Sequence, residues 1–161
     1  MPTPPTIDVV VVTWRQRELT LRCLEHLGAQ TAAFQLIVVD NASGDGTADA
    51  VRARWPDATV IEQAENVGFG RACNAGAAAG TGEVIVLVNN DLFVEPQFLA
   101  KLVAPLAADE QVGQVAGVTL LPGDGPARID SAGVLLDRTL AGMNFLRHAP
   151  AAAAAGRRPG V

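Results

Sequence analysis

Short apolar runs alternate with segments of helix-like spacing through most of the chain. The apolar runs end in polar or turn-forming residues, which is typical of strands in a parallel sheet. The predicted strands are 7–13, 35–40, 58–62, 83–90 and 112–121. A first helix is predicted around Leu21, Leu24 and Leu27. Further helices are predicted over residues 47–55 and 70–79 and after Pro96. Repeated strand–helix alternation implies right-handed crossovers, so the expected fold class is α/β with a mostly parallel central sheet.

The most informative strand is the apolar and β-branched run that begins at Glu83. Its composition predicts a strand buried on both faces. It finishes on two amides and a carboxylate, Asn89, Asn90 and Asp91. Polar groups at the carboxyl end of a parallel strand lie where open α/β sheets bind ligands. One carboxylate with flanking amides suits a hard divalent cation that keeps several waters and is shared with a phosphate.

A second predicted strand also ends on a carboxylate, Asp40, which is followed by the turn-forming segment 41–47. An acceptor in this place can bind a base N–H or a ribose hydroxyl. The alternative is an Asx-type turn with a helix cap. A calcium loop is excluded, because counting from Asn41 puts Arg52 where the final glutamate is required. Beside a strand that ends in Asp91, the ligand-binding interpretation is favoured.

The glycine-bearing segment 65–76 does not fit a dinucleotide-binding fingerprint. The third glycine of that pattern is replaced by Cys73, and the segment follows the third predicted strand rather than the first. What remains is a loop entering a helix with Arg71 in its first turn. Arg71 is either a ligand for a diphosphate or base edge or an ordinary surface arginine. Thr13, at the end of the first strand, is either a nucleoside contact or an ordinary β-branched strand residue.

Composition narrows the functional classes. The chain has 161 residues, of which 49% are hydrophobic and 18% charged, as in a globular domain. Its net charge of −5 and lack of clustered Lys and Arg argue against nucleic acid as a partner. Cys23 and Cys73 form no paired motif and are expected to be buried in a reducing compartment. With no signal region and no membrane-spanning run, we expect a cytoplasmic protein, with association at the inner face of the membrane left open.

Four segments together carry a family resemblance: IDVVVVTW, LIVVDNASGDGT, NVGFGRACNAG and EVIVLVNNDLFVEP. They resemble family 2 glycosyltransferases of the GT-A fold, a Rossmann-like three-layer sandwich. The nearest likeness is to bacterial rhamnosyltransferase-like members that assemble cell-envelope polysaccharide. The resemblance covers residues 7 to about 121. It implies a nucleotide-diphosphate sugar donor of UDP or dTDP type and a glycan or lipid-linked acceptor.

The resemblance also implies roles for individual residues. It makes Asn89-Asn90-Asp91 this chain's version of the Asp-x-Asp metal motif, with Asp91 as the ligand of Mg²⁺ or Mn²⁺. Thr13 and Asp40 then belong at the nucleoside, and Arg71 near the base or diphosphate. The implied nucleotide-binding residues are Thr13, Asp40, Asn66, Gly68, Arg71, Asn89 and Asn90.

The expected organisation is a disordered N-terminus (1–6), a nucleotide-sugar-binding core (7–121), the start of an acceptor-side region (122–148) and a low-complexity tail or linker (149–161). An inverting transfer needs a downstream acidic base. Asp124, Asp130 and Asp137 have no context resembling the family's base motif, so no base is assigned. We therefore expect the truncated, donor-binding portion of a longer enzyme. The alternative is a non-catalytic nucleotide-sugar-binding module. A nucleotidyltransferase is disfavoured, because segment 13–17 lacks its expected glycines.

Overall fold

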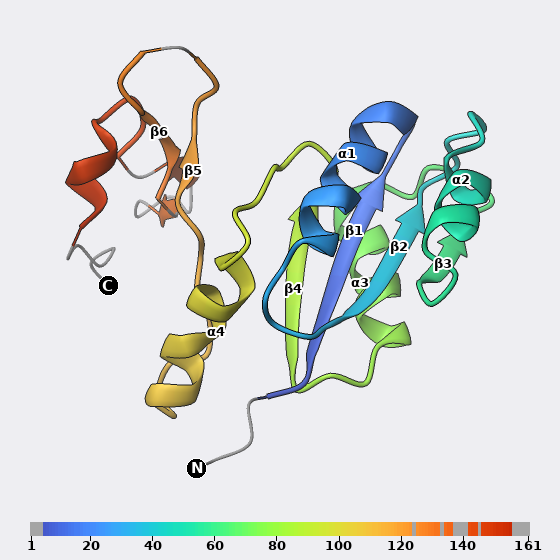
Figure 1. Ribbon diagram of the computed structural model, residues 1–161, viewed down its shortest axis with the longest axis horizontal. Helices are drawn as coiled ribbons and strands as arrows, with labels where there is room; N and C mark the ends of the chain where they lie inside the picture. The colour runs from blue at the N-terminus through green and yellow to red at the C-terminus, as the bar shows by residue number, and fades with distance from the viewer. Residues whose placement is uncertain (1–4, 124, 133, 137–141, 145, 156–161) are drawn as a thin grey trace. The chain divides into compact units, whose positions relative to one another are not determined.

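The computed structural model describes residues 5–123, 125–132, 134–136, 142–144 and 146–155. The chain divides into two compact units, an N-terminal unit of residues 1–108 and a C-terminal unit of residues 109–161 (Figure 1). The boundary thus lies before residue 121, where the sequence places the end of the core.

The N-terminal unit is built on a parallel sheet with the strand order β3-β2-β1-β4. Each strand except β4 is followed by a crossover helix that returns the chain to the same edge, as the alternating pattern predicts. This arrangement confirms the expected α/β class. The elements are β1 (Ile7–Thr13), α1 (Arg17–Gly28), β2 (Gln35–Asp40), α2 (Thr47–Arg54), β3 (Thr59–Glu62), α3 (Phe69–Ala79), β4 (Val84–Asn89) and α4 (Phe98–Ala108).

Helices cover both faces of this sheet and make the three expected layers (Figure 1). On one face, α1, α2 and α4 bury a cluster that includes Leu24, Val51 and Leu99 against β1, β2 and β4. On the other face, α3 packs Ala72 and Cys73 against β1 and β2. Burial of both faces of β1 and β2 explains their continuous apolar runs.

Strand register brings the polar strand ends together at one edge of the sheet. Thr13 of β1 pairs with Asp40 of β2, and Val12 of β1 pairs with Asn89 of β4. Because the strands are parallel, their carboxyl ends lie side by side. The residues that follow these strands are therefore placed around one opening.

The prediction that residues 83–90 form a strand buried on both faces is wrong. Val86 and Val88 are buried, but Ile85 and Leu87 are 46% and 52% exposed. Among the described residues, β4 pairs only with β1, so it forms an edge of the sheet. α3 packs against β1 and β2, so it does not cover the face of β4 that carries Ile85 and Leu87. The apolar run indicated a strand correctly, but how many neighbours cover a strand is a property of the tertiary structure.

The C-terminal unit contains short antiparallel pairs. β5 (Thr119–Leu120) pairs with β6 (Ile129–Ser131), and β7 (Val134–Leu136) pairs with β8 (Gly142–Asn144). The strand expected over 112–121 is thus limited to its last part and does not join the parallel sheet; Gly113 and Gly117 weaken a strand there.

Part of the expected tail is ordered against β6. A 3₁₀ helix (Ala151–Ala154) follows Pro150. The amide of Ala151 donates to the carbonyl of Ala127 at 2.9 Å, and the amide of Ile129 donates to the carbonyl of Ala149 at 2.9 Å. Residues 156–161 lie outside the described part of the chain. No described helix combines the length and the apolar character that a membrane crossing requires.

Candidate functional site

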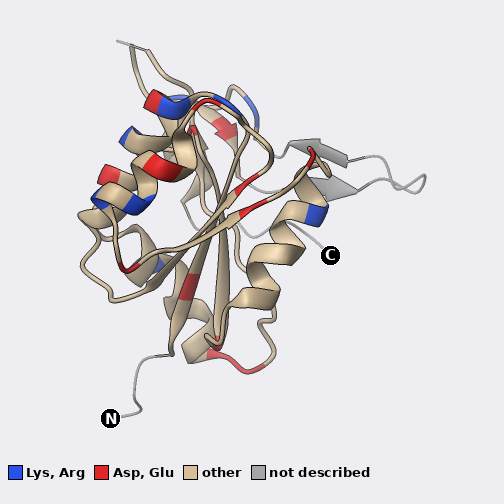
Figure 2. Ribbon diagram, turned by 90° about the vertical axis from the view of Figure 1, so that its right-hand side faces the viewer, with Lys and Arg blue, Asp and Glu red and all other residues tan. Residues whose placement is uncertain are grey.

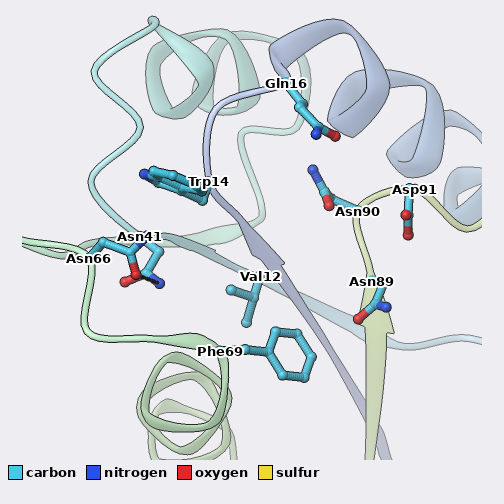
Figure 3. A pocket seen from close by; sticks show the side chains of 9 residues that line it. All are labelled: Val12, Trp14, Gln16, Asn41, Asn66, Phe69, Asn89, Asn90 and Asp91. Carbon is cyan, nitrogen blue, oxygen red and sulfur yellow. Dashed lines mark hydrogen bonds between the residues drawn. The ribbon is translucent and has the colours of Figure 1, made fainter.

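A cavity of about 310 Å³ lies at the carboxyl ends of the strands of the N-terminal unit (Figure 3). Its walls come from the end of β1, the loop after β2, the loop leading into α3 and the end of β4. The lining residues are Val12, Trp14, Gln16, Asn41, Asn66, Phe69, Asn89, Asn90 and Asp91. Four of the expected site residues therefore lie in one cavity, namely Asn66, Asn89, Asn90 and Asp91.

Asp91 is exposed, lines this cavity and lies two residues after the end of β4. The preceding side chain, Asn90, donates from Nδ2 to the hydroxyl of Thr20 at 3.1 Å. Beneath this loop, the thiol of Cys23 donates to the backbone carbonyl of Asn89 at 3.5 Å. Burial, together with the negative charge of Asp91, raises the pKa of Cys23 to about 11. Cys23 therefore stays a neutral thiol at physiological pH.

Thr13 is the last residue of β1, as the sequence predicts. It is fully buried, and its hydroxyl donates to the carbonyl of Arg15 at 3.2 Å and contacts the hydroxyl of Thr20 at 2.8 Å. It lines neither cavity described here. Arg15 and Gln16, which follow it, both have positive φ angles of 58° and 63°. Such backbone costs free energy and persists only where its surroundings hold it, so Thr13 supports the loop after β1.

Asp40 lies in a second hollow of about 250 Å³, lined also by Ala42, Ser43, Gly44, Glu62 and Gln63. Its Oδ1 accepts a hydrogen bond from the amide of Ser43 at 2.8 Å. The Ser43 hydroxyl in turn accepts from the amide of Arg15 at 2.8 Å. Asp40 thus closes the turn that follows β2 and also lines a hollow.

A pair of amide side chains joins the loops after β2 and β3. Asn41 donates from Nδ2 to Oδ1 of Asn66 at 2.9 Å, and its own Oδ1 accepts from the amide of Val67 at 3.0 Å. Asn66 Oδ1 also accepts from the amide of Gly68 at 2.9 Å. Asn41 is buried, so its own two bonds are partly sheltered from water, whereas Asn66 is exposed. They place the entry to α3 against the cavity.

Gly68 and Arg71 lie near the cavity but outside its lining. Gly68 precedes α3 with a φ of +83°, a conformation that explains the glycine. Arg71 is exposed on the first turn of α3. The side chain that α3 presents to the cavity is Phe69, which is 53% exposed.

Sequence reasoning missed Trp14, Gln16, Asn41 and Phe69 as lining residues. Trp14 and Gln16 follow β1 directly, so the rule that was applied to Asp40 and Asp91 would have found them. Asn41 and Phe69 carry no comparable signal. Their position depends on the amide pair and on the path of the loop into α3.

The chemistry of the cavity fits a metal that is shared with a ligand. Within the described residues, no group of three or more His, Cys, Asp or Glu side chains could hold an ion by itself. Asp91 is the only carboxylate that lines the cavity, and amide oxygens flank it. Elsewhere in the N-terminal unit, acidic and basic residues are interspersed along α1 and α2 (Figure 2). One carboxylate suits an ion that completes its shell with phosphate oxygens and water.

The fold and the polar strand ends define an open α/β domain of the kind that binds ligands at the carboxyl ends of its strands. The chain belongs to glycosyl transferase family 2, whose family model matches residues 8–138. The resemblance found in the sequence is confirmed at this level.

Named relatives agree with the family. An uncharacterized glycosyltransferase of Nostoc sp. is 27% identical over 122 residues, which is 73% of this chain and 38% of the relative. An N-acetylglucosaminyltransferase of Bradyrhizobium elkanii is 30% identical over 120 residues, covering 70% of this chain and 65% of the relative. The chain thus spans only part of the length of these relatives.

Solved structures confirm the GT-A fold. A mannosyltransferase from Pyrobaculum calidifontis, in complex with GDP-Man and Mn²⁺, matches with a TM-score of 0.63 and 29% identity. That match covers 69% of this chain and 34% of the mannosyltransferase. TarS of S. aureus, at 22% identity, shares the fold with a TM-score of 0.60.

Proposed function

We propose that this chain binds a nucleotide-diphosphate sugar together with a divalent metal. It would serve as the donor-binding part of an inverting glycosyltransferase that acts on a glycan or lipid-linked acceptor of the cell envelope. One observation carries the proposal: the two strands that flank β1 lead to carboxylates, with Asp40 at the end of β2 and Asp91 two residues after β4, and a hollow opens beside each. A lipid-linked acceptor would place the enzyme at the inner face of the membrane. A rhamnosyltransferase-like donor preference remains part of the proposal.

Asp40 is proposed to bind the nucleoside. One of its oxygens accepts the Ser43 amide, and a carboxylate has further acceptor capacity. That capacity favours bases that present an N–H, such as the uracil or thymine of UDP- and dTDP-sugars. The guanine of GDP-sugars also presents an N–H, and the Pyrobaculum mannosyltransferase binds GDP-Man. Trp14 is 49% exposed at the cavity and offers an aromatic face for stacking.

Asp91 is proposed to bind the metal, either Mg²⁺ or Mn²⁺. The Mn²⁺ in the Pyrobaculum complex supports this choice of ion class. When bound, the metal would stabilise the negative charge that builds on the leaving diphosphate. Asn89 is exposed in the cavity and is proposed to contact ribose or sugar, while Asn90 orients the loop. Arg71 and the loop at Asn66 and Gly68 are proposed to lie beside the diphosphate.

A second candidate function is a binding module with no turnover of its own. It is favoured by the cavity lining, in which Asp91 is the only carboxylate and is assigned to the metal. Among the late acids, Asp130 pairs with Arg147 at 3.5 Å. A base for the acceptor hydroxyl is therefore not assigned to any residue of this chain.

Calorimetric titration of UDP, dTDP and GDP, with Mn²⁺ or with EDTA, tests the proposal. We expect one of them to bind, and to bind more tightly with Mn²⁺. Asp91→Ala should abolish the effect of Mn²⁺, because losing a group that holds a metal costs on the order of tenfold or more in metal affinity. The affinity for nucleotide without metal should stay within about twofold, because Asp91 then has no ion to bind. Asp57→Ala, which removes an exposed carboxylate outside both hollows, is the matched control.

Two results would count against the proposal. If Asp91→Ala kept the full Mn²⁺ dependence, the metal assignment would be wrong. If the parent chain bound none of the nucleotides, the donor-binding function itself would be wrong. To separate enzyme from binding module, sugar transfer from the preferred donor should be measured with the same chain. Transfer to an acceptor would reject the module.

A further inference from the structure

We propose that Thr20 of α1 is a positioning residue for the metal-binding loop, acting through the side chain of Asn90. This proposal rests on the function proposed above for Asp91. Thr20 has no exposed surface, so it does not touch a ligand. Its hydroxyl instead joins three parts of the site: the end of β1, the strained loop after it and the loop after β4.

The hydroxyl protons around Thr20 determine which way the Asn90 amide points. Thr13 donates to the carbonyl of Arg15, and Thr20 donates either to the carbonyl of Gln16 at 3.2 Å or to Thr13 at 2.8 Å. Each hydroxyl has one proton, so both donors are already used. Towards Asn90 the hydroxyls can only accept, which they do from Nδ2 at 3.1 Å and 3.5 Å.

The Asn90 amide is therefore held with its nitrogen on the threonines. Its Oδ1 is the polar atom left for the cavity that Asn90 lines (Figure 3). Without the Thr20 hydroxyl, the shorter of the two bonds is lost and the amide is free to rotate. The carboxylate of Asp91, the next residue, is then no longer held in place through the side chain of Asn90.

Thr20 is the first of four residues, Thr20, Cys23, His26 and Gln30, that hydrogen-bond to residues 89–99. The Cys23 thiol donates to the carbonyl of Asn89, and Nδ1 of His26 lies 3.3 Å from the carbonyl of Val94. Further along, Gln30 donates from Nε2 to the carbonyl of Glu95 at 2.7 Å and accepts at Oε1 from the amide of Leu99 at 2.9 Å.

Thr20, Cys23 and His26 are spaced three apart in α1 and so lie along one side of the helix, and Gln30 lies just beyond its end at Gly28. The segment 89–99 is thus positioned largely by α1 and by Gln30. Thr20 is the one of these four residues that bonds to a side chain lining the cavity.

Three variants of the chain test the proposal. Thr20→Val removes the hydroxyl and keeps the shape, and Thr20→Ser restores the hydroxyl. Thr47→Val is the matched control, because Thr47 is also fully buried near a helix start but bonds to Asp45 and has no contact with Asn90. Each protein is titrated with UDP and with GDP, in Mn²⁺ and in EDTA, and its melting temperature is measured.

We expect Thr20→Val to reduce the tightening by Mn²⁺ by roughly tenfold, as is common when a group that orients a metal ligand is lost. The affinity in EDTA should change less than about twofold, and Thr20→Ser should restore the Mn²⁺ effect. Thr47→Val should lower the melting temperature without changing the Mn²⁺ effect. An unchanged Mn²⁺ effect in Thr20→Val, or equal loss in Thr47→Val, would overturn the proposal.

NMR separates a failure of this inference from a failure of the proposed function. In the nucleotide-free chain, Thr20→Val should shift the side-chain amide signals of Asn90 and broaden the backbone amides of 89–92. If those signals stayed unchanged, the positioning role would be wrong whether or not a nucleotide binds. If they changed while the parent chain bound neither UDP nor GDP, only the proposed function would fail.

Discussion

Gly76 in α3 offers a sharp test of how the helix packs over the sheet. The residue is buried, and a Cβ atom built on it would overlap the side chain of Val10 in β1. The same Cβ would lie 3.0 Å from Cγ2 of Val39 in β2. Both valines are almost without exposed surface and are held by neighbours on either side. Gly76→Ala therefore forces α3 away from the strands that carry the cavity.

The size of the effect follows from two opposing terms. Alanine stabilises a helix interior by up to about 1 kcal/mol relative to glycine. Overpacking of a filled core costs about 1–3 kcal/mol, and the upper part of that range applies where the new atom overlaps a side chain with no room to move. Gly76→Ala should thus lower the free energy of unfolding by about 1–2 kcal/mol.

Gly70, in the same helix, provides the control. A Cβ at Gly70 meets no atom within 4 Å, so Gly70→Ala keeps the helix gain without the overlap. Urea denaturation followed by circular dichroism should show Gly76→Ala less stable and Gly70→Ala at least as stable as the parent. If the two substitutions had the same effect, the close approach of α3 to β1 would be refuted.

Two further predictions concern buried polar groups of the site. Asn41→Ala should lower the free energy of unfolding by about 2 kcal/mol, because Val67 and Asn66 lose a sheltered partner; unchanged urea denaturation would contradict the amide pair. Burial, together with the charge of Asp91, raises the pKa of Cys23 from 9.0 to about 11, so the unfolded chain loses this proton first. The contribution of the neutral Cys23 thiol to the free energy of unfolding is complete below about pH 9. It should decline by at most roughly 2–3 kcal/mol as the pH rises to about 11. Cys23→Ala should flatten that decline in denaturation curves, and an equal decline in both proteins would exclude the thiol as its cause.

The parallel strands were predictable because their residues carry the signal themselves. The runs that end at Thr13, Asp40 and Asn90 are apolar and β-branched, and such runs form strands whatever their exact neighbours are. The placement of Asp40 and Asp91 at one edge of the sheet, where each lines a hollow, was predictable because parallel strands bring their carboxyl ends to one edge. Family membership likewise followed from segments that are local in the sequence.

Roles that depend on a partner were not predictable. The sequence leaves Thr13 open between a nucleoside contact and an ordinary strand residue, and it gives no sign that the hydroxyl bonds to Thr20 and to the backbone of Arg15. Asn41 looks like a turn residue, and it joins two loops through Asn66. A hydrogen bond between residues far apart in the sequence leaves no local pattern, so these roles became visible only in the folded chain.

Local patterning by itself determined the α/β class, the order of the main elements and the two acidic strand ends, Asp40 and Asp91. Only the tertiary structure decided that β4 is an edge strand with one face open among the described residues. It also decided that Trp14 and Phe69 line the cavity and that α1 holds the loop of Asp91. The physical reason is that hydrophobic periodicity encodes which face of an element is apolar. Which neighbour covers that face, and which distant donor meets a given acceptor, is settled by packing.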